Sequence, residues 1–268
     1  MIVDHPVNLP DLRDRVALVT GAGRGIGRAV AGDLARAGAT VAVVARSADQ
    51  LADIAREIRA AGGGAAACTA DLTSLGAAQE LVTRATRELG AIDVLVNNAG
   101  TVAPLGPTES LDAAEVEASY QLNILAPMVL SAAVIPAMRA RNWGRIVNVS
   151  SGIVANPAGM VGANTYAGVK SALEAHSRNL AAELDGTGIT VNVYRPGRVD
   201  TAMQAWIRSQ DPARVGGGLV DRFAAAYQAR ELITPAESAA ALVSRLSSPD
   251  TGQIWDVTDV SPHLVERN

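Results

Sequence analysis

The sequence lacks the features of several broad protein classes. Its only cysteine, Cys68, has no second cysteine with which to form an intramolecular disulfide, which suits a reducing compartment. The formal net charge is −4 and no basic stripe is present, so neither nucleic acid nor an anionic membrane surface is expected as a partner. No apolar run of about 18 or more residues is apparent, and the first residues carry charges and prolines where a secretory signal needs an apolar segment. We therefore expect a cytoplasmic protein that does not bind a membrane.

Lysine is also nearly absent. Of the 23 basic residues, Lys170 is the single lysine and the others are arginine. The chain therefore uses arginine wherever a general positive charge is needed, which makes Lys170 the exception to explain. It ends the stretch "TYAGVK" (165–170), four residues after Tyr166.

What is present is a repeating pattern of short apolar strands and longer helices. Strands are expected near 16–20, 40–45, 65–70, 92–97, 144–149, 189–195 and 252–257, with helices near 25–37, 48–61, 75–89, 112–141 and 164–184. Strands that are apolar on both faces and alternate with helices indicate a parallel sheet covered on both sides. We predict a single α/β domain over residues 15–268: a Rossmann-type doubly wound fold with a seven-stranded parallel sheet and helices on both faces. Residues 1–14 are expected to form a loose N-terminal arm.

Residues 201–233 interrupt this pattern. The segment contains two short helical stretches around three consecutive glycines, Gly216, Gly217 and Gly218. A glycine hinge in a long connection beyond a strand end is typical of a mobile substrate-binding lid. The alternative interpretation is a surface excursion without a role in binding.

The stretch "TGAGRGIG" follows the first strand and opens the first helix. Its glycines Gly21, Gly25 and Gly27 allow a tight turn and let the backbone approach a pyrophosphate, which the positive end of the helix attracts. A glycine triplet alone is weak evidence, but its position in the first βαβ unit favours a dinucleotide-binding site.

The end of the second strand, "VVARS", indicates which dinucleotide is bound. NAD sites usually carry a carboxylate there for the ribose 2′-hydroxyl, but this chain has Ala45 followed by Arg46. A guanidinium can pair with a 2′-phosphate, and Arg24 in the glycine loop is a second candidate for that contact. We therefore predict NADP(H), with NAD(H) as the alternative if both arginines are ordinary surface residues.

Polar residues end the next two strands. Asp71 could accept a hydrogen bond from the adenine amino group, or it could cap the following helix, and the sequence does not separate these roles. In "NNAG" (97–100) the asparagines can bond the neighbouring backbone and Gly100 leaves room beside a cofactor, which favours a mainly structural role.

A catalytic group is expected at the same edge of the sheet. Ser150 and Ser151 end the fifth strand, and Tyr166 and Lys170 share a face of the following helix because they are four residues apart. A free tyrosine has a pKa near 10, so about one in a thousand is ionised at pH 7. A neighbouring ammonium stabilises the phenolate, so the phenol can exchange a proton with a substrate oxygen. The serine hydroxyl can hold that oxygen where negative charge develops.

With these motifs in order, the chain resembles the short-chain dehydrogenase/reductase family over about residues 14–258. The shared features are "TGAGRGIG", "NNAG", the serine after strand five, "YAGVK" and "RPG" (195–197). The resemblance implies that Tyr166 is the general acid/base, that Lys170 binds the nicotinamide ribose and tunes the phenol, and that Ser151 positions the substrate oxygen. It also implies that Asn123, in "LNILAP", maintains a proton relay and that Thr201 lies near the carboxamide end of the cofactor.

The complete set of residues expected to contact the dinucleotide is Gly21, Arg24, Gly25, Ile26, Gly27, Arg46, Asp71, Leu72, Asn98, Ala99, Gly100, Tyr166, Lys170, Pro196, Gly197, Val199 and Thr201. The expected substrate is a small carbonyl compound or alcohol, and the resemblance implies a homo-oligomer, either a tetramer or a dimer. The three histidines are scattered without metal-ligand spacing, so no metal site is expected.

Two departures from the family pattern leave points open. The interval between Ser151 and Tyr166 is slightly longer than is usual, which leaves open the shape of the substrate pocket and the choice between Ser150 and Ser151. The C-terminal stretch lacks the double glycine often found there, which leaves the subunit contact at that end open. A non-catalytic dinucleotide-binding protein is the alternative from another functional class, although the intact set Asn123, Ser151, Tyr166 and Lys170 argues against it.

Overall fold

The computed structural model describes residues 9–259 and contains one sheet of seven parallel strands in the order β3-β2-β1-β4-β5-β6-β7. The strands are β1 (Val16–Thr20), β2 (Thr40–Ala45), β3 (Ala65–Thr69), β4 (Val94–Asn97), β5 (Gly144–Val149), β6 (Ile189–Arg195) and β7 (Ile254–Asp256). The predicted doubly wound fold is thus confirmed. The order reverses between β1 and β4, and ligands of such sheets bind beyond the carboxyl ends of the strands at this point.

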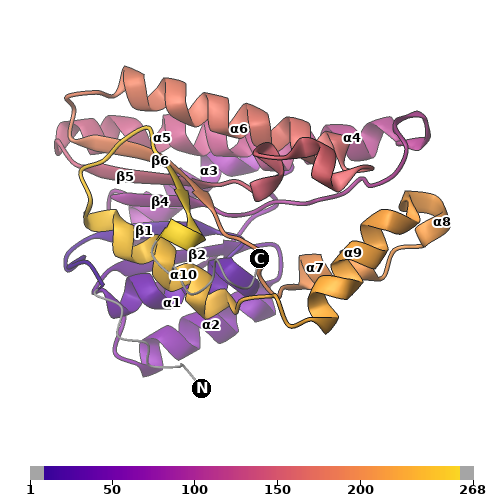
Figure 1. Cartoon of the computed structure of the whole chain (residues 1–268). Helices are drawn as coiled ribbons and strands as arrows, with labels where there is room; N and C mark the ends of the chain where they lie inside the picture. Colours follow the sequence, from indigo (N-terminus) through magenta and orange to yellow (C-terminus); the bar gives the residue numbers. More distant parts are fainter. Residues whose placement is uncertain (1–8, 260–268) are drawn as a thin grey trace.

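Helices cover both faces of the sheet (Figure 1). They are α1 (Gly25–Arg36), α2 (Ala48–Ala60), α3 (Leu75–Leu89), α4 (Ala113–Tyr120), α5 (Ala126–Ala140), α6 (Asn164–Glu183), α7 (Ala202–Arg208), α8 (Pro212–Val215), α9 (Gly217–Gln228) and α10 (Pro235–Val243). A π-helical turn, η2 (Gln121–Leu125), joins α4 to α5, and the 3₁₀ turns are η1 (Thr108–Ser110), η3 (Gly152–Val154), η4 (Pro157–Met160), η5 (Ser244–Ser247) and η6 (Val257–Asp259).

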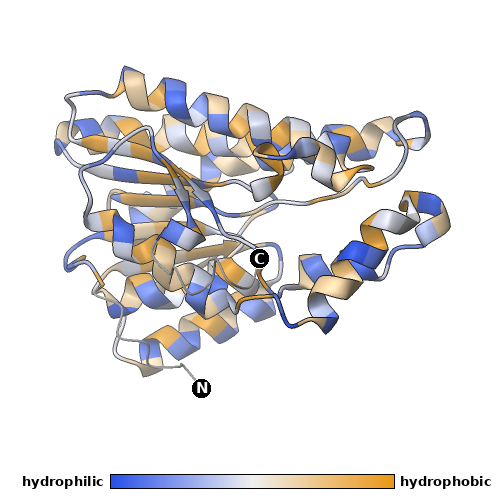
Figure 2. Ribbon diagram, viewed as in Figure 1, coloured by the Kyte–Doolittle hydropathy of each residue, from blue (hydrophilic) through white to orange (hydrophobic). Residues whose placement is uncertain are grey.

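Two apolar clusters account for this layered arrangement. One joins the sheet to α1, α2 and α10, and the other joins it to α3, α5 and the end of α6. Figure 2 shows the central strands mostly in hydrophobic colours, whereas the surrounding helices alternate between polar and apolar residues. Strands β1, β4 and β5 are buried along their whole length, as expected for a parallel sheet between two helical layers. Cys68 is buried on β3.

The described part of the predicted N-terminal arm, residues 9–14, packs on the body of the fold. Leu12 is only 2% exposed, and its backbone N–H donates to the carbonyl of Ala37 at 2.8 Å. The apolar side chain therefore fixes this stretch beside the end of α1. The rest of the arm, residues 1–8, and the C-terminal residues 260–268 lie outside the described part of the chain.

The long helix predicted at 112–141 is present at 113–140, but η2 interrupts its regular hydrogen bonding. By length and composition alone, this helix could cross a membrane, which corrects the expectation that no segment is long and apolar enough. In the structure, 44% of its most apolar 18-residue stretch is buried, and α5 shares an apolar cluster with α3 and the sheet.

The segment 201–233 forms three helices, α7, α8 and α9, rather than the two stretches expected. Val199 and Ile233 form an isolated parallel bridge, so the excursion leaves and re-enters the fold at one place. Gly216, with φ +93°, separates α8 from α9, a conformation that glycine adopts without strain. The three helices project from the body of the fold (Figure 1). Movement of this segment remains a prediction.

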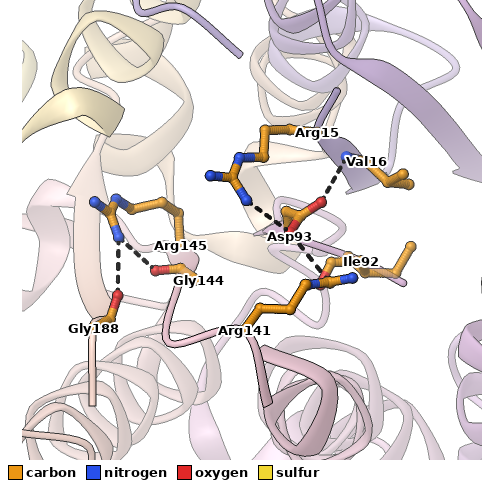
Figure 3. Close-up of polar contacts among 8 residues, drawn as sticks. All are labelled: Arg15, Val16, Ile92, Asp93, Arg141, Gly144, Arg145 and Gly188. Atoms are coloured by element: carbon orange, nitrogen blue, oxygen red, sulfur yellow. Dashed lines mark hydrogen bonds and ion pairs between the residues drawn. The ribbon is translucent and has the colours of Figure 1, made fainter. Parts of the chain in front are cut away.

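A polar network closes the opposite, amino-terminal edge of the sheet (Figure 3). The Asp93 carboxylate accepts a hydrogen bond from the Val16 backbone N–H at 3.0 Å and pairs with Arg141 at 3.2 Å and Arg15 at 3.4 Å. Asp93 is 3% exposed, so these partners take the place of water around its carboxylate. The guanidinium groups of Arg15 and Arg145 also lie 4.0 Å and 4.5 Å from the centre of the Trp143 ring.

We expect Asp93→Ala to lower the free energy of unfolding by about 2–3 kcal/mol, because hydrogen bonds to a buried charged group are lost together. Urea unfolding monitored by circular dichroism measures this change. Asp53→Ala is the control, because Asp53 forms an exposed ion pair with Arg56 that should contribute little. Equal unfolding midpoints for the two variants would contradict a stabilising role for the Asp93 network.

Candidate active site

The glycine loop lies between β1 and α1, at the carboxyl edge of the sheet. Gly21 and Gly25 have positive φ angles of +67° and +57°. A Cβ atom on Gly27 would lie 2.4 Å from the Gly21 carbonyl oxygen, so a side chain at residue 27 would collide with the turn. No side chain caps the start of α1 at Arg24, which leaves the first backbone N–H groups for another acceptor. This arrangement fits the pyrophosphate of a dinucleotide.

The end of β4 is tied to this loop. The Thr20 hydroxyl accepts hydrogen bonds from the backbone N–H groups of Asn98 and Ala99, both at 3.0 Å. The Asn98 side-chain amide donates to the Thr20 carbonyl at 2.9 Å. Asn98 and Ala99 therefore hold the glycine loop against β4. Gly100 follows at a crowded position, because a Cβ there would lie 2.7 Å from Asn123 Oδ1 and 3.4 Å from Lys170 Nζ.

Two cations border the end of β2. Arg24 and Arg46 are exposed, and within residues 9–259 neither takes part in an ion pair. The half-buried Ala45 occupies the strand end where a carboxylate would repel a phosphate. Ile26, in the first turn of α1, is half-buried against the apolar cluster that joins α1 to the sheet. The two guanidinium groups are therefore available for an anionic partner.

The end of β3 is occupied by a local turn. Asp71 Oδ1 accepts from the Thr73 N–H at 3.1 Å and from its hydroxyl at 2.8 Å. These hydrogen bonds lower the pKa of Asp71, and the charge of Arg46 adds a smaller effect in the same direction. Ser74, not Asp71, caps α3 with its hydroxyl, while Leu72 is buried in the core. The contacts of Asp71 thus favour a role in stabilising the turn. Both hydrogen bonds with Thr73 use Oδ1, and Oδ2 takes part in neither.

Tyr166 and Lys170 lie on one buried face of α6. Tyr166 is 7% exposed and Lys170 4%, and the Lys170 ammonium lies 5.7 Å from the centre of the Tyr166 ring. Lys170 Nζ donates a hydrogen bond to the Val149 carbonyl at 2.9 Å. Burial lowers the pKa of Lys170 to about 8, against the opposing charge of Glu174. Burial raises the pKa of the Tyr166 phenol, and a hydrogen bond with the Ser151 hydroxyl partly offsets this.

The two serines after β5 face different partners. Ser150 is 3% exposed and its hydroxyl donates to Glu174 Oε1 at 2.7 Å. Ser151 is half-buried and caps η3 by accepting from the Ile153 N–H at 3.4 Å, and its hydroxyl lowers the pKa of the neighbouring Tyr166 phenol. Ser151 is therefore the serine beside the phenol, whereas Ser150 is held by Glu174, and the catalytic role of Ser151 remains a prediction.

Asn123 is positioned by the π-helical turn η2. Its side-chain amide donates to the carbonyls of Thr101 and Ser119, both at 3.0 Å, and its Oδ1 accepts from the Thr101 N–H at 3.3 Å. The side chain is fully buried, and Asn123 and Lys170 both border Gly100. Such π-turns often occur at functional sites, because the extra residue redirects a side chain.

The loop after β6 closes the site from the other side. Pro196 is half-buried, Gly197 has φ +76°, and Val199 is buried in the bridge that opens the 201–233 excursion. A Cβ on Gly25 would lie 3.4 Å from Thr201 Cγ2, so Thr201 borders the glycine loop. The structure thus brings the predicted residues of β1, β4, β5, α6 and the β6 loop to one edge, while Leu72 points into the core.

Sequence reasoning did not identify one buried pair at this edge. Glu174 is 5% exposed and forms a two-point ion pair with Arg195. The signal was present, because Glu174 continues the series Tyr166 and Lys170 at helical spacing and so lies on their face.

Comparisons with known proteins agree with this geometry. The sequence matches the family model described as short chain dehydrogenase over residues 15–212. The 2,3-dihydro-2,3-dihydroxybenzoate dehydrogenase of Bacillus subtilis is 32% identical over 254 residues, which cover 94% of this chain and 95% of that protein. A structure of 7α-hydroxysteroid dehydrogenase with NADH and 7-oxo glycochenodeoxycholic acid has a TM-score of 0.80 at 30% identity, covering 95% of this chain and 96% of that one. A structure of actinorhodin polyketide ketoreductase with NADPH has a TM-score of 0.80 at 33% identity, with coverages of 91% and 95%.

Proposed function

The chain belongs to the short-chain dehydrogenase/reductase family of oxidoreductases, and from this we propose that it is an NADP(H)-dependent enzyme that interconverts a carbonyl compound and a secondary alcohol. The observation that carries the proposal is the group of Tyr166, Lys170 and Ser151: the first two are buried on one face of α6, the ammonium lies 5.7 Å from the centre of the phenol ring, and the Ser151 hydroxyl lowers the pKa of the phenol. The bound dinucleotide would supply the hydride for reduction or accept it in oxidation.

The protein's own residues would handle the proton and the substrate oxygen. At pH 7, a Lys170 pKa of about 8 leaves the protonated form in excess by roughly ten to one. The ammonium then favours the phenolate, which makes Tyr166 a better proton donor and acceptor. The Ser151 hydroxyl, beside that phenol, would hold the oxygen on which negative charge develops. Reduction would end with a proton moving from the Tyr166 hydroxyl to this oxygen.

The glycine loop would hold the pyrophosphate, and Arg24 and Arg46 would hold the 2′-phosphate of NADP(H). Pro196, Gly197 and Thr201 would border the nicotinamide end, with Lys170 at its ribose. Helices α7–α9 would then act as the lid over the substrate. NAD(H) is the alternative cofactor, and the related 7α-hydroxysteroid dehydrogenase was solved with NADH. The end of β2 carries Ala45 and Arg46 in place of a carboxylate, which supports NADP(H) for this chain.

We expect Arg46→Asp to weaken NADPH binding by roughly 10- to 100-fold, the size of a lost charge-assisted hydrogen bond, and to improve NADH binding. Isothermal titration calorimetry with each cofactor measures the ratio of dissociation constants. Arg178→Asp is the matched control, because it makes the same charge change on the exposed side of α6. Tighter binding of NADH than NADPH by the unmodified protein would overturn the cofactor assignment.

A non-catalytic dinucleotide-binding protein is the second candidate. It would bind NADPH with normal affinity but turn over no carbonyl compound. A panel of ketones, aldehydes and 3-oxoacyl thioesters, assayed by loss of NADPH absorbance, separates the two. We expect turnover of at least one class, because no member of the set Asn123, Ser151, Tyr166 and Lys170 is missing.

A further inference from the structure

A buried ion pair lies directly behind the candidate catalytic residues. Arg195 Nε donates to Glu174 Oε1 at 2.9 Å, and its terminal nitrogen donates to Oε2 at 2.8 Å. Oε1 also accepts from the Ser150 hydroxyl at 2.7 Å. The side chain of Glu174 is 7% exposed and that of Arg195 16%, so water screens the pair weakly.

The three members of this network come from the three segments that build the site. Ser150 precedes Ser151 after β5, Arg195 precedes Pro196 at the end of β6, and Glu174 follows Lys170 by one turn of α6. One carboxylate therefore joins the serine loop, the proline-glycine loop and the catalytic helix. A small movement of Glu174 would change the distances among all three.

Stability alone does not explain such a pair. Removing two charges from water costs several kcal/mol, and apolar residues of similar volume often stabilise a protein as well or better. A two-point guanidinium–carboxylate contact does, however, fix both distance and angle.

We propose that Glu174, held by Arg195 and Ser150, is a positioning residue that sets the orientation and the charge of Lys170 and aligns the ends of β5 and β6 around Tyr166. This inference rests on the function proposed above for the kinetic effect, but its electrostatic part concerns the protein alone.

The charges around Lys170 predict in which direction its pKa should change when a neighbour is removed. Tyr166 and Glu174 flank it on α6, the Val149 carbonyl at the end of β5 accepts its hydrogen bond, and Asn123 on η2 borders Gly100 beside it. Arg195 contributes a positive charge from β6, and Asp256 on β7 acts on Arg195. Glu174 raises the pKa of Lys170, against the larger effect of burial. Removing Glu174 should therefore lower that pKa, and removing Arg195 should raise it.

The single lysine makes a direct test practical. Labelling the full-length protein with [¹³Cε]lysine gives one resonance, that of Lys170, whose shift with pH reports its titration. We expect the midpoint to move to lower pH in Glu174→Gln and to higher pH in Arg195→Gln. Glu183→Gln, an exposed exchange at the end of the same helix, should leave it unchanged.

Midpoints that shift in opposite directions would indicate an electrostatic role, because a loss of stability would shift the Lys170 midpoint of both variants in the same direction. Circular dichroism shows whether each variant folds. If Glu174→Gln does not fold, the midpoint of Arg195→Gln still tests the inference. In the kinetic arm, kcat of Glu174→Gln should fall by roughly 10- to 100-fold while KM for the carbonyl changes little, as expected for misplaced catalytic groups. Unchanged or parallel midpoints would overturn the inference, as would normal kcat. Failure of the unmodified protein to turn over any carbonyl would instead refute the proposed function and leave the titration result standing.

Discussion

Replacing Tyr166 with Phe is expected to reduce turnover by about 10²- to 10⁴-fold or more, the contribution of a positioned general acid. The variant removes one hydroxyl from a ring that is 7% exposed, so the packing of α6 against the apolar residues around it is retained. Loss of the interaction between the phenol hydroxyl and Ser151 should change the free energy of unfolding by no more than about 1 kcal/mol. Steady-state kinetics with NADPH and an accepted carbonyl compound measures the effect.

The control for this variant is cofactor binding. Calorimetry should give a dissociation constant for NADPH close to that of the unmodified protein, because the glycine loop and both arginines are untouched. Tyr227→Phe is the matched variant, since it removes the same hydroxyl from a ring that is 51% exposed on α9. Full activity in Tyr166→Phe would rule out the phenol as the proton donor.

Lys170→Arg is expected to lower kcat by about 100-fold although the positive charge is kept. Lys170 Nζ lies in a closed space, 2.9 Å from the Val149 carbonyl and beside the backbone of Gly100. A guanidinium is wider and planar, so it cannot occupy the same point without moving its neighbours. Misplacing a charge by about 1 Å near the reacting atoms can cost about 10²-fold in rate.

This exchange also tests why the chain keeps one lysine. Arg178→Lys is the control, because it makes the reverse exchange at an exposed position of the same helix and should leave kcat unchanged. Both variants should be compared by thermal unfolding, because overpacking at Lys170 is expected to destabilise by about 1–3 kcal/mol. Normal turnover in a folded Lys170→Arg protein would show that the lysine is not required.

Local sequence patterns predicted most of the fold. The strand at 40–45 and the helix at 75–89 have the predicted bounds, because glycines and polar residues delimit strongly apolar or periodic stretches. The helix predicted at 164–184 ends at Glu183. The parallel sheet followed from the βαβ pattern, since such crossovers join parallel strands, whereas the order of the strands comes from the structure.

Features that depend on non-local packing were not predicted. The Glu174–Arg195 pair joins residues 21 positions apart, and neither residue is unusual in its own helix or strand. No residue type in the segment 121–125 predicts its π-helical turn, yet this turn places Asn123 at the site. The sequence also does not show which of Ser150 and Ser151 lies beside Tyr166, because both follow the same strand and only their side-chain partners distinguish them.

The most direct test of the proposed function follows the hydride itself. The unmodified protein would be incubated with NADPH deuterated at both C4 positions and with each carbonyl compound of the panel, and the alcohol product would be analysed by mass spectrometry. We predict that the product of an accepted substrate carries one deuterium on the carbinol carbon, and that Tyr166→Phe forms almost none of it. An enzyme that binds NADPH tightly but transfers deuterium to no ketone, aldehyde or 3-oxoacyl thioester would contradict the proposed function.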